Sequence, residues 1–161
     1  AGSGRPPRCI WPRPAWGGEI HRAAWQNRTM SPTSPLPSRL ADQALFRERC
    51  FIDGAWVAAD GGGSIPVDDP ATGRQLGSVP AGGRSDTTRA VEAAVAAFEP
   101  WRRLTGKERA AVLRRWFELI LRHQEDLAVL MTLEQGKPLA EARGEVTYGA
   151  AFIEWFAEEA R

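Results

Sequence analysis

The side chains best suited to nucleophilic or metal chemistry in this 161-residue chain are two cysteines and two histidines, Cys9, Cys50, His21 and His123. The cysteines have no C-x-x-C spacing and no histidine cluster beside them, so the sequence does not predict a zinc site. A cysteine nucleophile needs a neighbouring base or a helix N-terminus, and the residues around Cys50 supply neither. We therefore expect Cys50 to be structural, and the lone His123 to cap a helix.

Asp68 and Asp69 form a pair of acids that could bind a cation. They precede Pro70 and Gly73, a pattern typical of a tight turn, in which aspartates accept hydrogen bonds from the nearby backbone. We expect that role for both side chains and keep a metal site as the alternative.

Two glycine clusters, at residues 61–63 and 82–83, are candidates for phosphate-binding loops. Neither matches G-x-G-x-x-G or G-x-x-x-x-G-K-[ST], so both are predicted to be ordinary loops. The chain also has no Ser/His/Asp set, so the residues alone predict no catalytic constellation.

The composition is that of a globular protein, with 43% hydrophobic residues, 25% charged residues and a net charge of +1. This balance creates no overall field that would attract nucleic acid or an anionic membrane. No run approaches the roughly 18 apolar residues of a membrane-spanning helix. Two cysteines without a disulfide pattern fit a reduced compartment, and we expect a cytoplasmic protein.

Residues 1–29 are rich in arginine, proline and tryptophan, contain a single acid, Glu19, and show no helical or strand period. We expect residues 1–44 to be a disordered or non-native extension and a proline-rich linker, and residues 45–161 to form the domain. A targeting peptide and a nucleic-acid-binding arm whose tryptophans stack on bases are the alternatives. A short helix is expected at residues 40–49.

Short apolar runs separated by turn residues predict two β-hairpins before the helices. In residues 50–57 two such runs flank Asp53-Gly54, a dipeptide that fits a type I′ turn. The second hairpin is expected to pair residues 64–67 with residues 75–79.

The helices follow from capping residues and from apolar residues at helical spacing. Ser85 is expected to cap a helix that begins at Asp86 and is stopped by Pro100. Thr105 and Glu108 form a capping box for the next helix. The apolar face of the first helix is expected at Val91, Ala94, Val95 and Phe98. The solvent-facing side of the second helix is expected to carry the charged residues Arg109, Arg114, Arg115 and Glu118.

Residues 132–146 join two further helices. Gly136 supplies the backbone freedom that a helix C-terminus favours, and Pro138 suits the first turn of the helix that follows. Beyond it, apolar residues at three-and-four spacing predict one buried stripe, which consists of Leu139, Ala142, Val146, Ala150, Ile153 and Ala157. A second edge of the same helix carries the aromatic residues Tyr148, Phe152, Trp155 and Phe156.

Several segments, in this order, resemble the N-terminal region of aldehyde dehydrogenases, most closely the succinate-semialdehyde dehydrogenase branch. They are FIDGAWV, DPATGRQLGSVP, AAFEPWRRLTGKERAAVLRRWFELI, MTLEQGKP and FIEWFAEEA, and the match runs from about Leu45 to the last residue. The resemblance implies an α/β fold: the first, incomplete part of a dinucleotide-binding domain, with two short β-hairpins followed by packed helices.

What the resemblance implies about function concerns a longer protein. The family oxidises an aldehyde to a carboxylic acid with NAD or NADP, through a cysteine nucleophile, a glutamate and an oxyanion site that includes an asparagine. The branch acts on succinate semialdehyde in 4-aminobutyrate degradation. These groups are expected beyond Arg161, so we expect the chain alone to be inactive, to bind no cofactor through its own residues, and to need the missing C-terminal remainder. Full-length members are expected to be homo-oligomers.

Few site residues can be carried over from the family to this chain. The helix from Leu139 is expected to flank the mouth of the substrate tunnel, with Gly144 and Tyr148 near that mouth. Asp68 and Glu134 match positions near a structural monovalent cation in some members. The competing hypothesis is a non-catalytic helical module that docks through the aromatic edge of the last helix.

Overall fold

The computed structural model describes residues 36–160. Two short 3₁₀ helices, two β-hairpins and four α-helices follow one another: η1 (Leu36–Arg39), η2 (Gln43–Leu45), β1 (Cys50–Ile52), β2 (Ala55–Val57), β3 (Ser64–Asp68), β4 (Gln75–Pro80), α2 (Arg84–Arg103), α3 (Gly106–Arg122), α4 (Gln124–Gln135) and α5 (Leu139–Glu159). The expected α/β class, with two hairpins followed by helices, is confirmed. The arginine-rich residues 1–29, with Cys9 and His21, lie outside the described residues.

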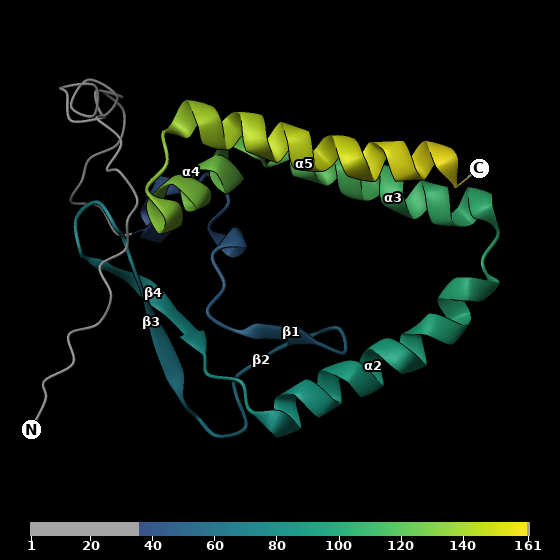
Figure 1. Ribbon diagram of the computed structural model, residues 1–161, viewed down its shortest axis with the longest axis horizontal. Helices are drawn as coiled ribbons and strands as arrows, with labels where there is room; N and C mark the ends of the chain where they lie inside the picture. The colour runs from purple at the N-terminus through teal and green to yellow at the C-terminus, as the bar shows by residue number, and fades with distance from the viewer. Residues whose placement is uncertain (1–35, 161) are drawn as a thin grey trace, which may run out of the picture.

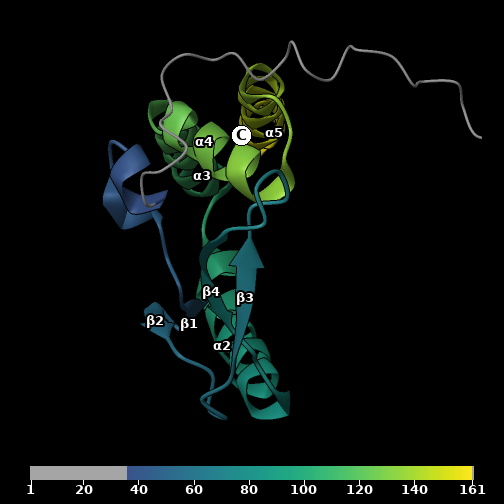
Figure 2. The same ribbon diagram turned by 90° about the vertical axis from the view of Figure 1, so that its left-hand side faces the viewer.

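The elements divide into two regions. In Figures 1 and 2, α3, α4 and α5 lie together on one side of the molecule, whereas the two hairpins and α2 lie on the other. The chain passes between the regions at the connection from α2 to α3, and α5 runs back antiparallel along α3 (Figure 1).

Both hairpins form as predicted. β1 pairs with β2 around Asp53 and Gly54, whose φ angles of 50° and 75° are those of a type I′ turn. β3 pairs with β4 with an irregularity at Val67 and Asp68. The short helix predicted at residues 40–49 does not form; only Gln43–Leu45 is helical, and Phe46 and Glu48 instead lie against β4. The carboxylate of Glu48 accepts a hydrogen bond from Ser78 N–H at 2.7 Å.

The hydrophobic core lies among η1, α4 and the start of α5. Its buried residues are Leu36, Leu40, Ala128, Val129, Leu133, Leu139 and Ala142. Leu36 and Leu40 belong to a stretch that the sequence analysis placed in the linker. The backbone that follows Leu40 is bonded to Asp126, whose carboxylate accepts the N–H groups of Ala41 and Asp42 at 2.8 and 2.9 Å.

Helix α2 differs from its prediction at both ends. Gly83, not Ser85, is the N-cap, because the carboxylate of Asp86 accepts the Gly83 N–H at 2.9 Å. Pro100 does not stop the helix, which continues to Arg103. A proline in a helix loses a hydrogen bond, and here Glu99 forms ion pairs across that position with Arg102 and Arg103.

Helices α3 and α5 form the main helical contact. The capping box at the start of α3 is confirmed: Glu108 accepts from Thr105 N–H at 2.7 Å, and Thr105 Oγ1 accepts from Glu108 N–H at 3.3 Å. Arg114 was expected on the solvent-facing side of α3. It instead forms ion pairs with Glu154 and Glu158 of α5. The predicted stripe of α5 is buried at Leu139, Ala142, Val146, Ala150 and Ala157, and half-buried at Ile153.

Within residues 36–160, none of the helices has both the length and the apolar character required to cross a membrane.

Candidate functional site

The joint between α4 and α5 packs against the turn of the second hairpin. Gly136 ends α4 with φ of 74°, as its sequence position predicted. A Cβ on Gly136 would lie 3.0 Å from Pro70 Cγ, so the two segments approach closely. The joint thus connects the helical region to the β3–β4 turn.

Polar side chains at the start of α4 fix the position of α5. The Nε2 group of Gln124 donates to the carbonyl of Arg143 at 3.0 Å and to Thr147 Oγ1 at 2.7 Å. Glu125 accepts two hydrogen bonds from Arg143 Nε and Nη2, at 2.8 and 2.9 Å. The hydrogen bonds with Glu125 raise the pKa of the Arg143 guanidinium. Together these contacts set which turn of α5 faces α4 and therefore where Gly144 and Tyr148 point.

Tyr148 lines an open groove of about 510 Å³ between α3, α4 and α5. Its ring is 66% exposed and meets Phe152 edge-on, with ring centroids 4.9 Å apart. The rest of the groove is largely apolar, with Leu127, Met131 and Val146 among its lining residues. Such a surface suits the apolar part of a small molecule or another protein segment.

Gly144 is exposed one helical turn before Tyr148, outside the groove lining. A Cβ at this position would meet no atom within 4 Å in this chain. Gly144 therefore has no packing reason to be glycine among the described residues.

The cation candidates Asp68 and Glu134 stand on the two segments that meet at Pro70 and Gly136. Within residues 36–160 no three His, Cys, Asp or Glu side chains group closely enough to hold a metal. The neighbouring acid Asp69 takes the local role that was predicted, since it accepts the Ala71 N–H at 2.8 Å and the Thr72 hydroxyl at 2.8 Å.

The remaining candidates for chemistry lie at the ends of elements or in loops. Cys50 is half-buried at the start of β1, where it pairs in register with Val57. His123 is the junction between α3 and α4, and its N–H donates to the Leu119 carbonyl at 3.1 Å. The glycines at 61–63 and 82–83 lie in loops, as predicted.

The profile of the aldehyde dehydrogenase family matches residues 56–161. This chain belongs to the aldehyde dehydrogenase family. It is 58% identical over 123 residues to glutarate-semialdehyde dehydrogenase of Pseudomonas aeruginosa, and 56% identical over 123 residues to the NADP⁺ succinate-semialdehyde dehydrogenase of Escherichia coli. Each alignment covers 76% of this chain and 26% of the relative.

Solved structures of the family share the fold. A crystal structure described as an E. coli NADP-dependent enzyme is 57% identical, with a TM-score of 0.74, and the superposition covers 74% of this chain and 25% of that one. The chain therefore spans about a quarter of the length of these aldehyde dehydrogenases. The expected resemblance to the semialdehyde dehydrogenase branch is confirmed.

The sequence analysis missed the residues that position α5. These residues are Gln124, Glu125 and Arg143. Their partners are 18 to 23 positions away in the sequence. Pairing rules for one helix concern residues only three or four positions apart, so they could not predict these contacts.

Proposed function

We propose that the aldehyde dehydrogenase of which this chain represents about a quarter oxidises a semialdehyde, an aldehyde that carries a carboxylate at its other end, with NAD or NADP. The observation that supports this most strongly is the identity of 56–58% to succinate- and glutarate-semialdehyde dehydrogenases. Those two substrates differ by one methylene. Succinate semialdehyde is our first choice and glutarate semialdehyde the second. We place the enzyme in the cytoplasm, where Cys50 would remain reduced.

In this proposal the described residues build and position the fold, and the reacting groups belong to the absent polypeptide. We infer from the family resemblance that the nucleotide would be held there as well. We assign the groove at Tyr148 to the mouth of the substrate path, with Gly144 beside it. An exposed aromatic pair at the rim of an apolar groove can guide a substrate without touching the reacting carbon.

A chimera tests this function. The matched 123 residues of the E. coli enzyme are replaced by the corresponding residues of this chain, and formation of reduced nicotinamide is measured with succinate semialdehyde and with glutarate semialdehyde. We expect turnover by the chimera and none by the 161-residue chain alone. A correctly folded chimera that oxidises neither semialdehyde would contradict the proposal.

Tyr148→Ala in the same chimera tests the assignment of the groove. A residue at the mouth should alter KM several-fold and leave kcat nearly unchanged, because it contributes to binding without contacting the reacting atoms. Arg49→Ala, an exposed change in the hairpin region, is the control. An unchanged KM would remove Tyr148 from the substrate path.

A second candidate function is a non-catalytic module that docks through α5. The favouring observation is the exposure of Tyr148, Phe152, Trp155 and Phe156 along one edge of that helix. Trp155→Glu distinguishes the two candidates. If this edge packs inside the enzyme, the change abolishes the activity of the chimera, whereas a separate docking module would leave turnover intact.

A further inference from the structure

The groove that Tyr148 lines has one charged side chain among the described residues, that of Glu145. Glu145 stands three positions before Tyr148 on α5, so the two side chains are neighbours on one face of the helix, with about 5–6 Å between their Cβ atoms. Apart from these two, the residues that line the groove are apolar or glycine. Glu145 therefore sets the charge at this opening.

Glu145 is paired with Lys137. The ammonium of Lys137, in the joint between α4 and α5, forms an ion pair with the carboxylate of Glu145. The lysine side chain is 24% exposed and the glutamate side chain 47%, so the cation is the more enclosed partner. Arg143, two residues before Glu145, is engaged by Glu125. In the described part of the chain, Lys137 is thus the cation that balances Glu145.

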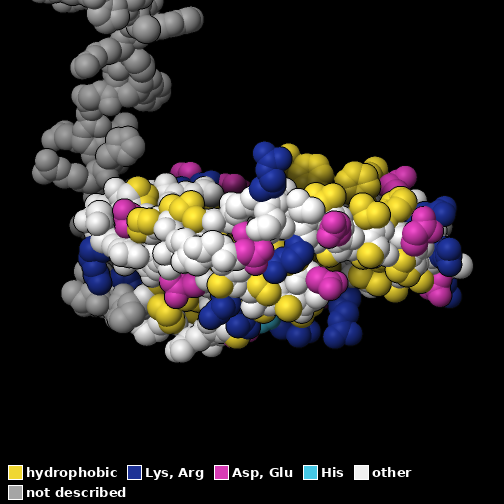
Figure 3. Space-filling model, turned by 90° about the horizontal axis from the view of Figure 1, so that it is seen from below, with side chains coloured by type: hydrophobic (Ala, Val, Ile, Leu, Met, Phe, Trp, Pro, Cys, Tyr) yellow, Lys and Arg dark blue, Asp and Glu magenta, His cyan; other side chains and the backbone are white. Residues whose placement is uncertain are grey.

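The sign of this charge matters because the proposed substrate is an anion. A semialdehyde carries a carboxylate at one end, and an unbalanced glutamate at the rim of the groove would repel it. The net charge of +1 supplies no long-range field to oppose that repulsion. On the face seen in Figure 3, acidic and basic side chains are interspersed. The local pair of Lys137 and Glu145 therefore decides how the groove receives an anion.

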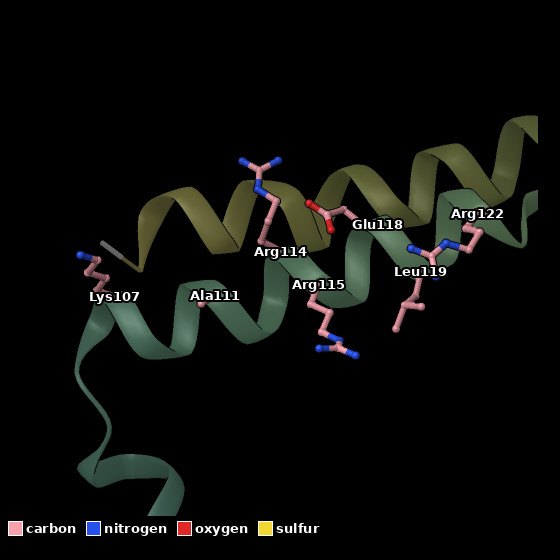
Figure 4. Close-up of a pocket in the computed structure, with 7 residues that line it drawn as sticks. All are labelled: Lys107, Ala111, Arg114, Arg115, Glu118, Leu119 and Arg122. Carbon is pink, nitrogen blue, oxygen red and sulfur yellow. The ribbon is translucent and has the colours of Figure 1, made fainter.

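A second hollow, on α3, is more basic. Its volume is about 940 Å³, and Lys107 and three arginines line it together with a single acid, Glu118. All of its lining residues belong to α3, and Arg115 and Leu119 point away from α5 in Figure 4. A substrate there would lie against one helix, without the apolar walls that several elements give the Tyr148 groove. The α3 hollow is the competing place for an anion, and removal of Lys107 tests it.

We propose that Lys137 is a specificity-determining residue of the semialdehyde dehydrogenase. By neutralising Glu145 at the rim of the Tyr148 groove, it removes the charge that would keep out an aldehyde bearing a carboxylate. Lys137 acts through Glu145 and has no part in the reaction at the aldehyde carbon, so its effect falls on KM and not on kcat. The inference rests on the proposed function, in which the Tyr148 groove leads to the site of the semialdehyde.

Two substrates, one anionic and one neutral, test this role. The chimera with the E. coli enzyme is assayed with succinate semialdehyde and with butanal, an uncharged aldehyde with the same number of carbons. The selectivity is the ratio of the two kcat/KM values. Lys137→Met leaves Glu145 unbalanced and should lower this selectivity about two- to fivefold, through the KM for the semialdehyde. Lys137→Arg keeps the charge and should retain the selectivity.

Glu145→Gln should give the opposite result. It leaves the cation unbalanced, so the selectivity for the semialdehyde should rise by a similar factor. The double variant Lys137→Met, Glu145→Gln carries neither charge and should return to the selectivity of the unaltered chimera. Salt at about 1 M should shrink both single-variant effects, because it shortens the Debye length to about 3 Å.

Lys107→Met is the matched control. It removes an exposed lysine of α3 that does not line the Tyr148 groove, and it should leave the selectivity unchanged. Circular dichroism of each variant of the 161-residue chain checks that the helices are retained. If Lys137→Met does not fold, Glu145→Gln, at an exposed position, gives the same test with the opposite sign.

Three results would overturn the proposal. An equal loss with both aldehydes in Lys137→Met would give this lysine a structural role. A selectivity that stays low in the double variant would mean that Lys137 contacts the carboxylate of the substrate directly. A fall in Lys107→Met but not in Lys137→Met would move the anion to the α3 hollow.

The failure of this inference is distinguishable from that of the proposed function. In each of those three cases, a chimera that still oxidises succinate semialdehyde leaves the proposed function standing. A correctly folded chimera that oxidises butanal but neither semialdehyde refutes the proposed function, and this inference with it.

Discussion

The helical region and the hairpin region of this chain bury their apolar residues differently. In the helical region Ala142 is fully buried and Leu133 is 5% exposed, whereas Val95 and Phe98 of α2 remain more than half exposed. Helices α4 and α5 follow one another in the sequence after a short connection and pack together. The hairpins and α2 have no comparable partner among the described residues.

A chain that spans about a quarter of its relatives' length can hold a local core and still leave apolar helix faces exposed. The connections between α3, α4 and α5 are short, and helices joined by short loops in other helical proteins also pack as direct neighbours. A surface helix normally buries one apolar stripe, and α2 has that stripe without the second layer. Stability should therefore be concentrated in the helical region.

The most direct way to break this comparison is a cavity in the core. Leu133→Ala should lower the free energy of unfolding by about 2–5 kcal/mol, because it removes buried methyl groups and leaves a void. The matched change Val95→Ala in α2 should alter it by less than about 0.5 kcal/mol. Urea denaturation followed by circular dichroism measures both. Equal effects would show that α2 is as well packed as α4.

The next effect concerns the link between η1 and α4. Asp126→Ala leaves the N–H groups of Ala41 and Asp42 without their acceptor, which should cost about 1–3 kcal/mol. Amides of residues 36–42 should then exchange faster with solvent. Asp69→Ala, which removes only local turn bonds, is the control. Unchanged protection at residues 36–42 would mean that Leu36 and Leu40 stay in the core without this acceptor.

The connection between the regions should contribute less. Thr105→Ala removes the side-chain half of the α3 capping box, and we expect a loss of about 1 kcal/mol. Thr105→Ser keeps the hydroxyl and should restore most of it. Thermal unfolding of the three proteins tests this ordering, and an alanine variant as stable as the serine variant would refute the role of the cap.

Acid should weaken both helix starts. The Gly83 N–H, with that of Asp60 and the charge of Arg89, lowers the pKa of Asp86, and the Thr105 N–H and hydroxyl lower the pKa of Glu108. A lowered folded-state pKa means that the unfolded chain binds more protons near about pH 4. The stabilisation is therefore present above that range and is lost as the pH falls through the folded-state values. The double variant Asp86→Asn, Glu108→Gln should show a shallower dependence of stability on pH between about 5 and 3; an unchanged slope would assign acid sensitivity to other carboxylates.

The smallest effect is expected from the exposed ion pair between α4 and α5. Arg143→Ala should change the free energy of unfolding by about 0–1 kcal/mol, since both partners contact solvent. Its effect on position should be easier to detect, as faster exchange of the α5 amides near Tyr148. High salt should reproduce part of the change in the unaltered protein, and a large loss of stability that salt does not affect would indicate a packing role instead.

Much of the fold could be predicted because its signals are local. The type I′ turn at Asp53-Gly54, the capping box at Thr105 and the left-handed Gly136 each depend on residues within four positions of one another. The predicted cap at Ser85 and stop at Pro100 were wrong because tertiary and side-chain contacts favoured alternatives. Asp86 also accepts from Asp60 N–H at 3.1 Å, and Glu99 pairs with Arg102 and Arg103, one turn further along α2.

The candidate site was less predictable than the fold. The family-like segments led to the prediction of Gly144 and Tyr148; Tyr148 lines the open groove, and Gly144 lies outside its lining. Gln124, Glu125 and Arg143 orient that surface, but no sequence motif marks them. Their hydrogen bonds form only when α4 and α5 lie side by side.

By itself, the sequence determined the two hairpin turns, the capped start of α3, the end of α4 at Gly136, which face of α5 is buried, and that the chain resembles aldehyde dehydrogenases. Backbone preferences and side-chain periodicity act over a few residues, so these features are local. The tertiary structure decided that Leu36 and Leu40 enter the core through an acceptor 85 residues away. It also decided that Arg114 ties α3 to α5, and that the apolar face of α2 stays exposed. Those outcomes depend on which distant groups come within bonding distance, and only the folded chain sets that distance.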